Sequence, residues 1–360
     1  MGRRVTLTSR DRVNRMFMRR EQDRIPRCDT FWPETVDRWR SEGLQGDAGT
    51  ALKRLECDLH GISWISPQIF PGREELVAED EQTKVIRDGF GKTVRYWKGR
   101  SGTPEHLGFD CETREIWEQQ YKPRLLRNPL QLKLAELKQH YCEAGERWSY
   151  LAGVEPFELS RYVMGDEITL IAMCEDPEWI ADFARVYTDV CLKHFDAIYD
   201  AGVHTDGLWI YGDMAYNHAT VCSPSHYREL IWPQHKRLVD WAHARGMKFI
   251  FHTDGDVNGV IDLYLSAGID CLQPLEAKAN MDVRVLAPRY GDRLALFGNI
   301  NVMTMATNNL EKIEAEIASK FAAGKATRGY MYHSDHSVPP SVSWQTYQQI
   351  IGLVDKYGWY

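Results

Sequence analysis

The stretch MKFIFHTD, residues 247–254, sets the pattern from which the fold can be read. An apolar run leads to His252, and the apolar character then stops at Thr253 and Asp254. Such a run is typical of a buried strand, and side chains two positions apart on a strand face the same side of the sheet. The stretch therefore predicts a buried strand that delivers an imidazole and a carboxylate to one site. A strand end capped by turn residues is the alternative interpretation.

Six further segments repeat this pattern of an apolar run that ends in polar residues. They are IPRCDTF (25–31), WSYLAGVE (148–155), GLWIYGD (207–213), IDCLQPLE (269–276), LALFGNIN (294–301) and GYMYHSDH (329–336). Helical patterns lie between them, at 177–202, 223–246 and 309–324. Strand, helix and strand at this spacing indicate parallel strands joined by crossover helices. Polar residues at the end of nearly every strand favour a (β/α)₈ barrel over a doubly wound sheet, which concentrates its ligands at one switch point.

One region departs from the barrel pattern. Residues 67–145 fit it poorly, and the alternating segment at 82–99 resembles a β-hairpin inserted into the barrel. No Pro- or Ser-rich linker divides the chain. We therefore expect residues 1–360 to form one elaborated barrel domain.

Composition excludes several classes of protein. The net charge is -7, with 51 acidic against 44 basic residues, so no basic field exists for nucleic acid. The N-terminus lacks the apolar segment of a secretory signal, and no run of eighteen apolar residues could span a membrane. The eight scattered cysteines indicate reduced thiols, and we expect a soluble cytoplasmic protein. Phosphate-binding glycine loops and the Gly-x-Ser-x-Gly elbow are absent from the sequence, which argues against nucleotide and serine-hydrolase chemistry.

The strand ends supply a candidate metal site. The expected ligands are His252, Asp254, Glu276 and His336. Imidazoles and carboxylates that converge on one spot can bind zinc or another divalent ion and leave a position open for substrate. Histidines that merely hydrogen-bond a neighbouring loop are the alternative.

Other polar residues near strand ends are candidates for substrate binding or catalysis. Asp213 could orient a base or hold a polar group, or it could cap the next helix. Arg161 could pair with a substrate carboxylate through its rigid fork, or form a surface salt bridge. Asn299 and His333 end two further strands, and we expect both to bind substrate.

Several segments together resemble the uroporphyrinogen decarboxylase superfamily. They are SRDRVNRMFMRREQDRIP near the N-terminus, WIYGDMAYNHATVCSPSHYRELIWPQHKRLVDWAHARG in the middle, and HTDGDVNGVIDLYLSAGIDCLQPLE, LFGNIN and YMYHSDHSVPPSVSWQTYQQIIGLVDKYG towards the C-terminus. The resemblance implies a (β/α)₈ barrel. It also implies one of two chemistries: decarboxylation without a cofactor, or methyl transfer to a corrinoid protein with zinc activation.

The resemblance also assigns roles to residues. Tyr162 and Asp58 fall where the decarboxylases place an active-site tyrosine and aspartate, and His336 matches the family histidine or a zinc cysteine. His252 matches the first zinc ligand of the thiol-activating methyltransferases, whose His-x-Cys is His-Thr-Asp in this chain. The resemblance thus implies Asp58, Tyr162 and His336 as catalytic residues, and we expect Asp213, from its place at a strand end, to act with them.

Departures from the family pattern limit the substrates and reactions that we expect. The arginine-rich stretch of true porphyrinogen decarboxylases is absent, and Trp32 and Glu34 stand in its place, so Trp32 is a candidate substrate contact. A ligand set of histidine and carboxylate makes zinc a harder Lewis acid than a thiolate set does, which suits an oxygen-bearing substrate.

We therefore expect a metal-dependent enzyme that demethylates a small methylated substrate, such as a methoxyaromatic, and passes the methyl to a corrinoid protein. The alternative is a decarboxylase, lyase or hydrolase acting on a small carboxylated substrate without corrinoid. A barrel without activity is the least favoured reading. The sequence does not fix the oligomeric state, and a homodimer is compatible with it.

Overall fold

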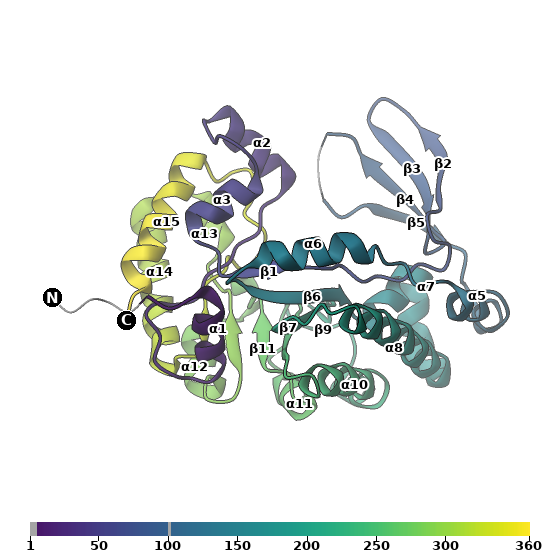
Figure 1. The fold of residues 1–360 in the computed structure, drawn as a ribbon. Coiled ribbons are helices and arrows are strands. Elements are labelled where there is room, and N and C mark those ends of the chain that lie inside the picture. Colours follow the sequence, from purple (N-terminus) through teal and green to yellow (C-terminus); the bar gives the residue numbers. More distant parts are fainter. Residues whose placement is uncertain (1–5, 100–101) are drawn as a thin grey trace.

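The computed structural model describes residues 6–99 and 102–360. Its centre is a curled, parallel sheet of seven strands in the order β1-β6-β7-β10-β11-β12-β13 (Figure 1). The strands are β1 (Leu59–Gly61), β6 (Trp148–Val154), β7 (Gly207–Tyr211), β10 (Lys248–His252), β11 (Cys271–Gln273), β12 (Ala295–Phe297) and β13 (Tyr330–Met331). Neighbouring strands in this order are also neighbours in sequence apart from the inserted segments, as crossover connections require. The fold is of the (β/α)₈ barrel type, as predicted.

The eighth position of the barrel is held by residues 25–31, which make isolated bridges rather than a regular strand. Arg27 pairs with Tyr332 and Phe31 with Val338, both in parallel, next to β13. On the other side the Asp58 N–H donates to the Arg27 carbonyl over 2.8 Å. The strand predicted at 25–31 is therefore only partly formed, because Pro26 offers no N–H to a ladder and a cavity separates the segment from β1 beyond Arg27.

Helices surround the sheet, and most follow the strand that precedes them. They are α1 (Ser9–Phe17), α2 (Pro33–Ser41), α3 (Ala48–Leu55), α4 (Arg114–Ile116), α5 (Lys122–Arg127), α6 (Leu134–Ala144), α7 (Pro156–Glu175), α8 (Pro177–Asp200), α9 (Pro224–His226), α10 (Trp232–His243), α11 (Ile261–Ala267), α12 (Val283–Tyr290), α13 (Val302–Ala306), α14 (Leu310–Thr327) and α15 (Trp344–Gly358). Two single π turns, η1 (Trp117–Tyr121) and η2 (Tyr227–Ile231), interrupt helical runs, and a 3₁₀ turn, η3 (Ala277–Ala279), follows β11. None of the described helices is long and apolar enough to cross a membrane.

The predicted hairpin at 82–99 is confirmed as β3 (Thr83–Asp88) and β4 (Lys92–Trp97), which pair in antiparallel fashion. It belongs to a larger sheet in the order β2-β3-β4-β5, with β2 (Glu74–Glu79) and β5 (Glu105–Phe109) at its edges. This sheet projects from the barrel above α7 (Figure 1). A small hairpin of β8 (Ala215–Tyr216) and β9 (Ala219–Thr220) follows β7.

Gly165 explains how the inserted sheet reaches α7. Its φ of +80° kinks the helix, and a Cβ there would lie 2.4 Å from a ring carbon of Phe109. Only glycine combines that conformation with such a close approach. The end of β5 is therefore seated directly on the helix that follows β6.

The barrel interior follows the two-residue period of its strands. Alternate side chains point inward and form an apolar cluster that includes Trp148, Trp209, Ile250, Cys271 and Phe297. The next inward position along each strand lies at the C-terminal rim of the sheet. That rim is where barrel enzymes place their active sites. All eight cysteines are free thiols.

Candidate active site

Three neighbouring strands place Tyr211, His252 and Gln273 side by side at the rim. His252 is in register with Tyr211 of β7 on one side and with Gln273 of β11 on the other. The His252 Nδ1 lies 2.5 Å from the Gln273 Oε1, and its ring centroid lies 4.7 Å from that of Tyr211. Because an amide oxygen only accepts, His252 donates through Nδ1–H, and Nε2 keeps a lone pair in the neutral form of the ring. A histidine held in this way is prepared to bind a metal ion through Nε2.

The free Nε2 faces two carboxylates. It lies 3.6 Å from the Asp213 Oδ1, and that oxygen also accepts a 3.1 Å hydrogen bond from the Asp254 N–H. One ligand atom from each of Asp213, His252 and Asp254 lies within 4.8 Å of the others. The Asp254 Oδ1 is buried and has no hydrogen-bond partner among the described residues. An imidazole lone pair and two carboxylates, one of them with an unpartnered oxygen, fit a divalent ion, so the three residues form a possible metal-binding triad.

The pKa of Asp254 also supports a cation site at the triad. Burial, together with the charges of Asp213 and Glu276, raises the pKa of Asp254 to about 6, while His252 and His336 oppose that rise. Burial disfavours the charged form of a carboxyl group, and nearby like charges disfavour it further. A bound cation would reverse both effects. The site is thus an acidic cluster that is short of positive charge.

A cavity of about 250 Å³ lies next to the triad. His252, Asp254 and His336 line it, together with Trp32 and His333. His336 stacks against Trp32 with ring centroids 5.7 Å apart, and its Nε2 lies 3.9 Å from the Asp254 Oδ2. The pocket therefore combines flat aromatic walls with the metal-binding triad.

His333 presents a second free lone pair in this pocket. It is only 1% exposed, its Nδ1 is hydrogen-bonded to the Ser334 carbonyl, and its Nε2 has no partner among the described residues. Burial lowers the pKa of His333, which keeps the ring neutral. A neutral imidazole that donates through Nδ1 leaves Nε2 as an acceptor.

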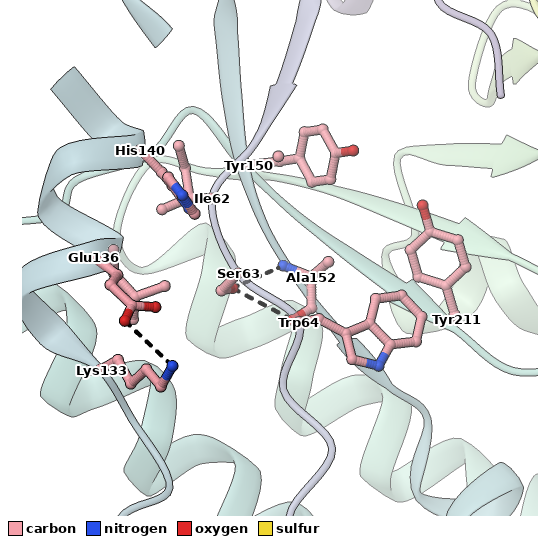
Figure 2. A pocket seen from close by; sticks show the side chains of 11 residues that line it. Ile62, Ser63, Trp64, Lys133, Glu136, His140, Tyr150, Ala152 and Tyr211 are labelled. Carbon is pink, nitrogen blue, oxygen red and sulfur yellow. Dashed lines mark hydrogen bonds and ion pairs between the residues drawn. The ribbon is translucent and has the colours of Figure 1, made fainter. Parts of the chain in front are cut away.

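Two further cavities meet this pocket at Tyr211. One of about 670 Å³ shares Trp209 and Tyr211 with it. The other, of about 410 Å³, is shown in Figure 2, where Tyr211 stands beside Trp64 and opposite Tyr150. Trp64 is 57% exposed and its ring centroid lies 4.9 Å from that of Tyr211. Aromatic side chains thus line both of these cavities as well as the pocket beside the triad.

Most of the predicted site residues meet at this rim. The structure brings Trp32, His252, Asp254, His333 and His336 into one pocket and places Asp213 beside them. Their roles in binding and catalysis stay predictions.

Two predicted site residues contact the backbone of the loops that carry the carboxylates of the triad. Glu276 is buried; its Oε2 accepts from the Gly255 N–H over 2.9 Å and its Oε1 pairs with Lys278 over 2.7 Å. Arg161 donates to the Asp213 backbone carbonyl over 2.7 Å and pairs with Glu158. Metal binding by Glu276 and substrate binding by Arg161 stay predictions. Both residues already have partners, and they fix the loops that carry Asp254 and Asp213.

Asp58, which is predicted to be catalytic, lies apart from the pocket beside the triad. It precedes β1, at the opposite end of the barrel, and is fully buried. Its oxygens lie 2.6 Å from Arg12 and 2.7 Å from Arg24, and they also accept from the Ser9 hydroxyl. A carboxylate saturated by two guanidinium groups holds the chain together and is not available to a substrate.

Tyr162 and Asn299 also lie apart from the pocket. Tyr162 lines a separate cavity with Phe90, under the Lys92 ammonium group, which lies 4.3 Å from its ring. Asn299 is fully buried and binds the Val283 N–H and the Leu275 carbonyl. Neither Tyr162 nor Asn299 lines the pocket beside the triad, and their roles in catalysis and substrate binding stay predictions.

Three residues of the site escaped sequence reasoning. Gln273 and Tyr211 lie on the same face of their strands as the pocket residues, and the two-residue period extended inward from Asp213 would have identified Tyr211. Asp29 holds the loop after β13 through the Ser334 hydroxyl and N–H and accepts from the Tyr332 and Tyr347 hydroxyls. No local signal separates Asp29 from an ordinary turn residue.

Comparison with known proteins agrees with the barrel fold. The curated proteins contain no match to the chain. Among solved structures, a methyltransferase from Methanosarcina mazei superposes with a TM-score of 0.71 at 15% identity, over 98% of this chain and 99% of that chain. At this identity the likeness establishes the fold only. The family model for uroporphyrinogen decarboxylase (URO-D) matches residues 143–357, which hold the triad and every strand from β6 to β13. The chain therefore belongs to the uroporphyrinogen decarboxylase family.

Proposed function

We propose that the protein is a metal-dependent methyltransferase, which removes a methyl group from a small methylated substrate and passes it to a corrinoid protein. The observation that carries this proposal is the triad of Asp213, His252 and Asp254 beside an aromatic pocket. The likeness in fold to a methyltransferase supports the choice within the family. Flat walls of Trp32 and Trp209 suit a methoxyaromatic ring.

The donor set favours zinc held by one imidazole and two carboxylates. Such an ion would supply Lewis acidity to an oxygen atom of the substrate, which makes that oxygen a better leaving group. The chain itself performs the remaining tasks. Gln273 fixes the tautomer of His252, Arg161 fixes the Asp213 backbone, and the aromatic walls exclude water from the substrate. We assign to His336, whose Nε2 lies 3.9 Å from the Asp254 Oδ2, the transfer of a proton to the oxygen that loses its methyl group.

The proposal is tested by assaying methyl transfer from methoxyaromatic compounds to a reduced corrinoid protein, followed by absorbance. We expect turnover that is lost after chelation and returns when zinc is added. Full turnover of the chelated protein would refute the requirement for a metal.

Replacing Gln273 by leucine should weaken zinc binding without disturbing the fold. The His252 Nδ1–H would lose its acceptor, and loss of an outer partner of a metal-binding histidine typically costs about 10- to 100-fold in metal affinity. Competition titration with a chromogenic chelator measures this. Gln273→Glu, which keeps an acceptor oxygen, should restore most of the affinity. Equal affinity in the wild type and the leucine variant would show that this hydrogen bond does not serve the metal.

Membership of the family supports a second candidate, a decarboxylase, lyase or hydrolase acting on a small carboxylated substrate without corrinoid. His336 is then the acid–base group left in the pocket, since Asp58 and Tyr162 lie elsewhere. Release of CO₂ from a carboxylated substrate by chelated protein would favour this candidate over methyl transfer.

A further inference from the structure

The compartment of about 670 Å³ beside the pocket of the triad is rich in hydrogen-bond donors. The hydroxyl groups of Tyr150 and Tyr211 line it, and no hydrogen bond joins either of them to a described residue. The Trp209 indole N–H, which belongs to the wall shared by the two cavities, is likewise buried without a partner. Burial raises the pKa of both tyrosines, so both remain protonated donors.

Two cationic side chains also line this compartment. The Lys53 ammonium group has no ion pair with a described residue. Arg147 donates to the backbone carbonyls of Ala144 and Glu143, and none of the described carboxylates pairs with it. The two acids of the lining have partners of their own, Asp29 in the Tyr332 and Tyr347 hydroxyls and Glu56 in Arg27. The compartment therefore offers hydrogen-bond donors and two cations without a carboxylate partner, beside His60, whose buried Nε2 has no partner among the described residues.

We infer that this compartment binds a carboxylate of the substrate, so that the substrate is a methylated aromatic acid whose ring lies along Trp209 and Tyr211. A carboxylate accepts several hydrogen bonds and donates none, which complements phenol, indole and ammonium donors. The two compartments lie on either side of the same aromatic residues, Trp209 and Tyr211, which line both. The inference rests on the proposed function for the position of the methyl group, but the anion site can be tested without turnover.

The test uses 4-methoxybenzoate and its neutral counterpart 4-methoxybenzamide as probes of the full-length protein. Binding is measured by isothermal titration calorimetry in the presence of chelator, so that neither metal nor methyl transfer is required. We expect the benzoate to bind about 10- to 100-fold more tightly, because hydrogen bonds to a charged group are the stronger kind.

Variants locate the carboxylate. Tyr150→Phe removes one donor and should reduce benzoate affinity about tenfold, while amide affinity changes less. Lys53→Met should reduce benzoate affinity about threefold, as expected for a solvent-accessible charge. Lys133→Met is the matched control: this lysine lies on the rim of the neighbouring cavity and is paired with Glu136 over 3.2 Å (Figure 2), so its loss should leave both probes unaffected.

Each outcome decides the inference. Equal binding of the two probes, absence of saturable benzoate binding, or a benzoate preference that survives both Tyr150→Phe and Lys53→Met would overturn it. Benzoate binding with the expected pattern, but without methyl transfer by the zinc-loaded protein, would keep the anion site and refute the proposed function instead.

Discussion

The His252→Ala protein should fold and yet fail to retain zinc. The substitution removes the one imidazole of the triad, whose Nε2 faces Asp213 while its Nδ1 is anchored on Gln273. We expect zinc affinity to fall by more than about 100-fold, because loss of an outer partner alone typically costs 10- to 100-fold. Methyl transfer should fall in proportion to metal content.

A matched control shows whether the loss of zinc affinity is specific to His252 or follows the removal of any histidine. His204 is exposed and stacks on Tyr199, with ring centroids 4.2 Å apart, in the turn that leads into β7. His204→Ala should therefore retain the wild-type zinc affinity. If both variants bind zinc as the wild type does, the triad is not the metal site.

The Asp58→Ala protein should lose about 3–5 kcal/mol of unfolding free energy, the typical cost of removing one partner from a buried ion pair. The substitution leaves Arg12 and Arg24 buried without their shared carboxylate. Urea denaturation followed by circular dichroism measures the change. Asp37→Ala is the control: Asp37 pairs with Arg40 over 2.9 Å on the exposed face of α2, and its removal should cost less than about 1 kcal/mol.

This experiment also separates a structural role of Asp58 from a catalytic one. Activity per mole of folded protein should be unchanged wherever the Asp58→Ala protein remains folded. A stable Asp58→Ala variant without activity would show that Asp58 has a catalytic role.

The sequence predicts most strands of the barrel because an apolar run that ends in polar residues marks them. The apolar runs that end at Asp213 and His252 appear in the structure as β7 and β10. By contrast, no apolar run marks β1 (Leu59–Gly61), which directly follows Glu56, Cys57 and Asp58. The incomplete strand at 25–31 could not be foreseen either, because its pairing depends on long-range contacts with β13 and Asp58.

The sequence predicts only part of the candidate site, because it indicates where strands end and not which partners a side chain has. Residues at strand ends such as His252 and His336 converge because parallel strands end at a common rim. Whether a carboxylate is free to bind depends on its partners, which the sequence does not display. Glu276 follows a strand as Asp213 does, but Lys278 and the Gly255 N–H occupy its oxygens.

The central claim is that Asp213, His252 and Asp254 hold a metal ion that the enzyme needs. The most direct test is the metal content of the wild-type protein purified without chelator, measured by inductively coupled plasma mass spectrometry alongside His252→Ala. We predict about one equivalent of zinc per wild-type chain and almost none in the variant, as expected for a site that needs its imidazole ligand. A wild-type protein that carries no stoichiometric metal and keeps full activity in chelator would contradict the account.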